Sequence, residues 1–161
     1  MNSVRILTVN PSDPKGTLFA RKWLGEIMSH KPTNWSVASN LADWQEIRRG
    51  DSFLFLLQGR KKGIIGFGEI LSKAGEGRYY STGEPGLFVK VRFAGIINPF
   101  AEPNLILSRE HLLQLGLTEF EFVRQSGRSI DAKIGEAVRN LFVSQVSLAR
   151  LVANREAKLA A

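Results

Sequence analysis

Residues that commonly catalyse reactions or hold metals are scarce in this chain. Its 161 residues include two histidines, His30 and His111, and no cysteine, so a zinc site built on thiolates is excluded. Asp43, Glu46 and Asp51 are close in sequence, but a predicted helix and turn separate them, whereas a nuclease needs clustered carboxylates to hold its metal ion. P-loop and serine-nucleophile motifs are absent. We therefore expect no catalytic residue, metal or cofactor, and expect that this chain alone is not an enzyme.

Basic residues beside aromatic residues in predicted loops are the stronger chemical signal. Lys and Arg number 22 against 15 Asp and Glu, which gives a net charge of +7. Cations of this kind hold phosphates, and neighbouring aromatic rings stack on bases. The candidate phosphate-binding residues are Arg60, Lys61, Lys62, Arg78, Arg124, Ser126 and Arg128. Each group alone is more often a solvated surface, and Ser126 also fits a tight turn, but together they favour nucleic-acid binding.

Apolar patterning predicts the elements that position these residues. Strands are predicted over residues 4–9, 34–39, 52–58, 63–71, 87–97 and 119–127, and helices over 17–29, 41–51, 108–117 and 129–142. Residues 72–86 are predicted to be a long polar loop. Gly63, Gly66 and Gly68 indicate tight curvature in one strand, as in a small barrel. The pattern predicts an α+β domain built on a small curved sheet.

The chain reads as one domain, residues 1–143, followed by a C-terminal helix or linker, residues 144–161. The final letters KLAA resemble the junction that an expression vector leaves before a purification tag, or else a natural alanine-rich helix end. No apolar run has the length of a membrane span, so we expect no membrane partner. The start lacks the features of a signal peptide and cysteine is absent, which together favour the cytoplasm.

Several motifs together resemble the EVE domain. They are a strand ending in NP, then NWS, then the block GDSFLFLLQGRKKGIIGFGEILS, and later FVRQSGRSI before a helix. The resemblance covers residues 4–143 and is strongest to the EVE-like modules fused to HNH nucleases in modification-dependent restriction systems. It implies the fold of the PUA-like superfamily, which includes YTH and ASCH domains. That fold is a curved mixed β-sheet or incomplete barrel with flanking helices.

The resemblance also implies a flipped, modified base held in an aromatic cage. Trp35, followed by Ser36, matches the position of the first cage tryptophan, and Asn10 matches a polar residue that bonds the base edge. The loop that supplies the second wall contains Tyr79 and Tyr80 in place of a tryptophan. Adjacent loop residues face opposite ways, so we expect one of the two tyrosines in the cage and favour Tyr79. Without the resemblance, Trp35 reads as a buried strand residue.

Three functional hypotheses follow. The first is a reader of 5-methylcytosine or 5-hydroxymethylcytosine in double-stranded DNA. It would be the specificity domain of a restriction endonuclease whose HNH nuclease lies beyond Ala161 and supplies a dimer contact. The second is a PUA-like RNA-binding module, such as a reader of N6-methyladenine. The third is an enzyme that acts on a small nucleotide or on RNA.

Overall fold

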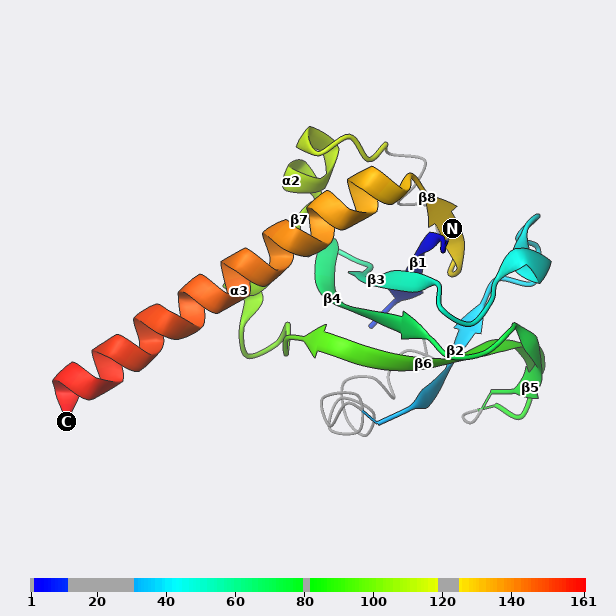
Figure 1. Cartoon of the computed structure of the whole chain (residues 1–161). Helices are drawn as coiled ribbons and strands as arrows, with labels where there is room; N and C mark the ends of the chain where they lie inside the picture. Colours follow the sequence, from blue (N-terminus) through cyan, green and yellow to red (C-terminus); the bar gives the residue numbers. More distant parts are fainter. Residues whose placement is uncertain (1, 12–30, 80–81, 119–124) are drawn as a thin grey trace.

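The computed structural model describes residues 2–11, 31–79, 82–118 and 125–161. In these residues, eight strands form one mixed sheet with the order β2-β6-β4-β3-β1-β8, while β5 pairs with β6 and β7 pairs with β4 (Figure 1). The strands are β1 Val4–Val9, β2 Thr33–Val37, β3 Ser52–Leu57, β4 Gly63–Ile70, β5 Gly75–Arg78, β6 Pro85–Ile96, β7 Leu107–Ser108 and β8 Arg128–Ile130. The pair β1–β3 is parallel, and the other described pairs are antiparallel.

Glycines let the sheet curl, as the sequence predicts. The register of β4 shifts against β3 between Phe55 and Leu56, and against β6 between Phe67 and Gly68. Such bulges bend a strand and increase its twist. A Cβ atom at Gly68 would overlap the carbonyl oxygen of Arg92 and the ring of Phe53. The neighbouring strands approach β4 so closely here that this position requires glycine.

The sheet curls so that its end strand β2 lies beside β1, the neighbour of the other end strand β8, and the gap between β1 and β2 is a seam. The two strands do not pair directly. Instead, the segment before β8 reaches both of them. The N–H of Ala38, just after β2, donates to the carbonyl of Ser126 at 2.8 Å, and the N–H of Gly127 donates to the carbonyl of Ile6 in β1 at 2.7 Å. The result is a half-barrel that is nearly closed at this point, which confirms the curved mixed sheet expected from the sequence.

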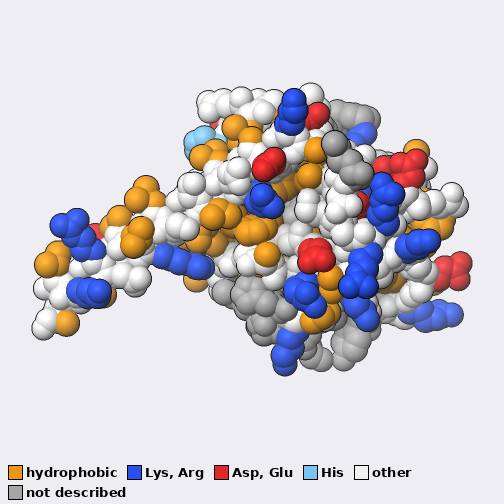
Figure 2. Space-filling model, in the orientation of Figure 1, with side chains coloured by type: hydrophobic (Ala, Val, Ile, Leu, Met, Phe, Trp, Pro, Cys, Tyr) orange, Lys and Arg blue, Asp and Glu red, His pale blue; other side chains and the backbone are white. Residues whose placement is uncertain are grey.

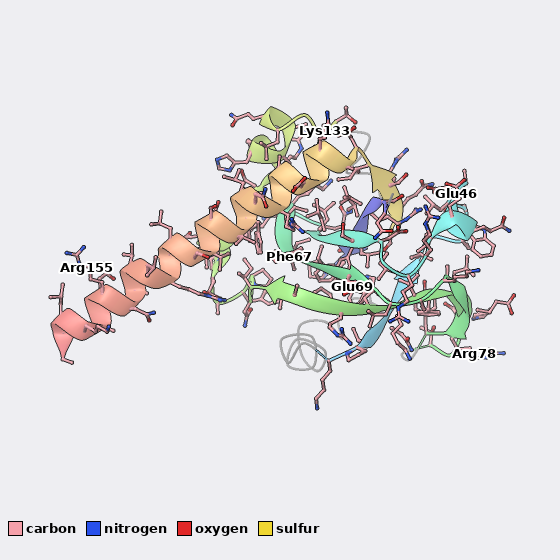
Figure 3. The ribbon with its side chains drawn as sticks, viewed as in Figure 1. Glu46, Phe67, Glu69, Arg78, Lys133 and Arg155 are labelled. Atoms are coloured by element: carbon pink, nitrogen blue, oxygen red, sulfur yellow. The ribbon has the colours of Figure 1, made fainter. Side chains whose placement is uncertain are left out.

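Apolar side chains fill both faces of the curled sheet. On the inner face, Phe53 and Phe55 each meet Phe93 edge to face, with ring centroids 5.0 and 4.9 Å apart. On the outer face, Phe67 of β4 points toward the long C-terminal helix (Figure 3), and its ring meets that of Phe142 edge to face, with centroids 6.2 Å apart. Aromatic pairs in this geometry add stability beyond their burial.

Two predicted helices are confirmed, although the second begins at Ala132 and not at Ser129, because Arg128–Ile130 forms the strand β8. The helix α2, Arg109–Gln114, begins where expected, and the hydroxyl of its N-cap residue Ser108 accepts from the N–H of His111. The helix α3, Ala132–Ala160, is capped by Asp131, whose carboxylate accepts from two N–H groups of the first turn. Its second half extends away from the sheet (Figure 1) and carries exposed apolar side chains (Figure 2). None of the described helices is apolar enough over a sufficient length to cross a bilayer.

Two further sequence predictions need correction, and two others fall outside the described residues. The helix predicted over 41–51 is a single 3-10 turn, η2 Trp44–Glu46, although Leu41 and Ile47 are buried and Trp44 packs against the core as expected. The polar loop contains β5, which pairs with the first half of β6. The helix predicted over 17–29 and residues 119–124 of the last predicted strand lie outside the described residues. A second 3-10 turn, η3 Pro103–Leu105, precedes β7.

A buried arginine joins β1 to three distant segments. Arg5 is 1% exposed, and its guanidinium contacts Asp51 at 3.2 Å, Asp43 at 3.1 Å and the carbonyl of Gly127 at 3.0 Å. The carboxylate of Asp51 also accepts from the N–H groups of Ser3 and Arg48. Buried charges persist in proteins when they are paired and hydrogen-bonded in this way. The network fixes β1, β3 and the start of β8 relative to one another.

Candidate nucleic-acid interface

Trp35 lies at the β1–β2 seam. Its indole N–H donates to the carbonyl oxygen of Thr8 at 3.1 Å. The ring meets Phe55 edge to face, with centroids 4.9 Å apart. In the register of β2 with β6, Trp35 pairs with the buried Val89, so its side chain lies on the inner face of the half-barrel. The side chain is only partly buried, so a rigidly held aromatic surface borders the seam.

Ser126 closes the seam next to Trp35. Its hydroxyl donates to the carbonyl of Ser36 at 2.8 Å and accepts from the N–H of Thr8 at 3.2 Å. Ser126 is 8% exposed. The hydroxyl therefore bridges β2 to β1 within the fold, and the predicted phosphate contact of Ser126 stays a prediction.

Ser36 and Asn10 occupy different positions around this seam. Ser36 pairs with Phe88, one residue along from the pair of Trp35 and Val89. Successive strand residues face opposite sides of a sheet, so the Ser36 side chain lies on the outer face. Asn10 directly follows β1 and is partly buried, two residues beyond the carbonyl that holds Trp35. Asn10 is therefore near Trp35 along the chain, and its predicted contact with the base stays a prediction.

The two predicted cage walls, Trp35 and Tyr79, lie on opposite faces of the sheet. The ring of Tyr79 contacts Phe88, with centroids 5.0 Å apart, and Phe88 is on the outer face with Ser36. The strands β2 and β5 both pair with the first half of β6, so it is the face of the sheet that separates the two walls. The structure thus does not bring Tyr79 to Trp35, because the unpredicted strand β5 holds it against β6. Tyr80 lies outside the described residues.

The predicted phosphate-binding residues separate into distinct groups. Arg60, Lys61 and Lys62 form the turn between β3 and β4 and line a pocket of about 440 Å³. Arg78 ends β5 at the other end of the sheet (Figure 3), where its guanidinium donates to the carbonyl of Gly83 at 2.9 Å. Arg128 opens β8 and pairs in register with Ile6. Arg124 lies outside the described residues.

The acidic residues considered for a metal site are held in other ways. Asp43 and Asp51 share the guanidinium of Arg5, and Glu46 is exposed on η2. In the described part of the chain, no group of three metal-ligating side chains is present. Sequence reasoning missed two features of the interface. The backbone carbonyl of Thr8 accepts the hydrogen bond from the Trp35 indole. Arg109, at the start of α2, lines the same pocket as the turn between β3 and β4.

The curled mixed sheet and C-terminal helix define a fold of the PUA-like type, as found in YTH domains and in human thymocyte nuclear protein 1. Human THYN1, solved in complex with DNA containing 5-methylcytosine, superposes with a TM-score of 0.60 and 14% identity, covering 88% of this chain and 98% of that one. Rpa0253 from Rhodopseudomonas palustris gives 0.59 and 14%, covering 86% and 91%. The Mmi1 YTH domain in complex with RNA gives 0.59 and 10%, covering 91% and 82%. No family model matches the chain, and no curated protein matches it significantly.

Proposed function

We propose that this protein reads a modified base in nucleic acid, with the flipped base held against Trp35 at the β1–β2 seam. The observation that carries this proposal is the fixed position of the Trp35 ring, which is tethered to Thr8, braced by Phe55 and still partly exposed. A base extruded from a duplex loses stacking worth a few kcal/mol, and an aromatic wall that is already rigid restores stacking at little entropic cost.

The preferred ligand in this proposal is double-stranded DNA that carries 5-methylcytosine or 5-hydroxymethylcytosine. A fold neighbour, human THYN1, was solved with 5-methylcytosine-containing DNA, and the basic net charge of +7 suits a phosphate polymer. In the cell, the chain would serve as the specificity domain of a modification-dependent restriction endonuclease, with the nuclease in a separate domain. This chain alone is expected to bind without cutting.

The test compares binding to matched oligonucleotides. Fluorescence anisotropy would give the Kd for duplex DNA with cytosine, 5-methylcytosine or 5-hydroxymethylcytosine at one central position, and for single-stranded RNA with or without N6-methyladenine. We expect modified DNA to bind at least about fivefold more tightly than plain DNA, since a methyl contact contributes roughly 1 kcal/mol. Equal Kd values for all DNA duplexes would reject the proposal. Tighter binding to methylated RNA would instead favour an RNA reader, the kind of ligand found with the Mmi1 YTH domain.

Two variants locate the reading site. Trp35→Ala is expected to abolish the preference for modified DNA while weak binding to plain DNA remains. Tyr79→Ala is the matched control, because it removes an aromatic ring from the outer face and should leave the preference intact. If Tyr79→Ala removes the preference and Trp35→Ala does not, the site is on the outer face. Circular dichroism of both variants would check that they are folded.

A further inference from the structure

A second basic site lies at the turn between β3 and β4. The pocket has a volume of about 440 Å³ and is open to solvent. It is lined by Gly59, Arg60, Lys61, Lys62, Pro103, Ile106, Ser108, Arg109 and Glu110. These residues come from two segments that β7 brings together, because Gly63 at the start of β4 pairs with Ser108. The pocket is therefore a consequence of the sheet topology.

The charge of this pocket favours an anion. Four of its residues are cationic and one, Glu110, is acidic. Arg60 and Lys61 are exposed and Lys62 is partly exposed. Within the described residues, no ion pair or hydrogen bond joins the side chains of these three to the rest of the protein. Four cations against one carboxylate leave the pocket with a net positive charge, so an anion bound among them is stabilised.

The pocket is close to the proposed reading site. Trp35 is tethered to Thr8, and the next residue, Val9, accepts a hydrogen bond of 2.8 Å from the N–H of Gln58. Gln58 precedes Gly59, the first residue of the pocket. Counting along this route, the indole N–H and the pocket are separated by on the order of 15 Å. Arg78 pairs with Pro85, four residues along β6 from Val89, the partner of Trp35, so its distance from Trp35 is of the same order.

We propose that the turn pocket binds a backbone phosphate of the same nucleic acid strand whose base is held at Trp35. This inference rests on the proposed function, which identifies the bound strand as nucleic acid. It assigns phosphate binding to the pocket and base recognition to Trp35. Contacts to phosphate fix the register of the strand and supply affinity, but they do not read the base. The turn pocket therefore sets overall affinity, and the seam sets preference for the modification.

The test removes charge at the pocket and, separately, at a matched distant place. The variant R60Q/K61Q/K62Q removes three cations at the turn. The control R150Q/R155Q/K158Q removes three from the half of α3 that extends away from the sheet, where Arg155 is seen in Figure 3. Both variants change net charge equally and alter exposed or partly exposed residues, so both should remain folded. The measured quantity is the dependence of log Kd on log salt for plain and modified DNA.

The expected result is uniform loss of affinity in the turn variant. Each lost phosphate contact should lower the salt slope by about 1, and Kd should rise by the same factor for plain and modified DNA. The control variant should keep the wild-type slope. An unchanged slope in the turn variant, or an equal fall in both variants, would overturn the inference. Failure of the proposed function shows itself differently, as the absence of any preference for modified DNA.

A competition experiment distinguishes nucleic acid from free phosphate. Inorganic phosphate and chloride would be compared at equal ionic strength for their ability to displace a fluorescent oligonucleotide from the wild-type protein. Equal displacement by the two salts is expected, because a backbone phosphate held within a longer strand is not readily replaced by the free ion. Specific displacement by millimolar phosphate, lost in R60Q/K61Q/K62Q, would assign the pocket to a free phosphate and overturn the assignment to nucleic acid.

Discussion

The indole N–H of Trp35 donates to the carbonyl of Thr8 at 3.1 Å, and this bond joins β2 to β1 across a seam where the described strands do not pair. Its consequence is that one side chain both helps close the half-barrel and presents an aromatic surface there. The orientation of the ring is fixed before any ligand arrives. This kind of preorganisation lowers the entropic cost of binding.

Trp35→Phe separates the tether from the ring. Phenylalanine keeps an aromatic surface but cannot donate to Thr8. We expect the free energy of unfolding, measured by urea denaturation, to fall by about 1 kcal/mol. The preference for modified DNA should decrease without disappearing. A variant with full preference would show that the hydrogen bond does not position the ring for binding.

Ser126→Ala distinguishes a seam residue from a phosphate contact. The substitution leaves the carbonyl of Ser36 and the N–H of Thr8 without their partner hydroxyl. We expect a loss of roughly 1–3 kcal/mol in the free energy of unfolding, with an unchanged salt dependence of DNA binding. A fall in the salt slope by about 1 with unchanged stability would instead support the phosphate contact expected from the sequence.

Arg5→Met tests the buried charge network. The variant leaves the fully buried carboxylate of Asp51 without its cation, and removal of one partner from a buried ion pair costs about 3–5 kcal/mol. Asp43→Asn is the matched control, because Asp43 is partly exposed at 27% and its loss leaves the pair of Arg5 and Asp51 intact. Urea denaturation should show a much smaller effect for this control. Similar losses in both variants would contradict the dominant role of Asp51.

Gly68→Ala tests the close approach that curves β4. Its new methyl group would meet the carbonyl oxygen of Arg92 and the ring of Phe53, and overpacking of this kind costs about 1–3 kcal/mol. Gly75→Ala in β5 is the control, since nothing lies within 4 Å of its added Cβ, and it should be neutral or slightly stabilising. Thermal unfolding followed by circular dichroism would compare the two. Equal melting temperatures would show that β4 relaxes at no cost.

Local patterning was enough to predict most of the sheet. The hairpin of β3 and β4, the long strand β6 and the capped start of α2 each have a clear apolar period or a capping residue. The strand β5 has the sequence GEGR, which carries no apolar alternation and contains residues with low strand propensity. It forms because the edge of β6 offers unpaired backbone groups. A strand made by pairing alone leaves no signal in its side chains.

In the candidate site, too, the residues with a local sequence signal were predictable and those that depend on strand pairing were not. The identity of Trp35 came from its sequence context, but the face on which Tyr79 lies depends on the register of β5 with β6. A shift of one residue in that register would reverse the face. Likewise, arginine is seldom buried, so the burial of Arg5 follows only from its distant partners Asp43 and Asp51, which are 38 and 46 residues away. Local patterns cannot predict contacts made at such separations.

The position of β1 has a consequence for synthesis on the ribosome. One edge of β1 pairs with β3, but the other pairs with β8 and is joined by Arg5 to Gly127, 122 residues later. At typical translation rates, that edge waits roughly 6–25 s for its partner to be made. Exposed strand edges can pair with other chains during such delays. The nascent protein is therefore most prone to aggregation before its last strand emerges, and a chaperone that shields the first strand should raise its yield.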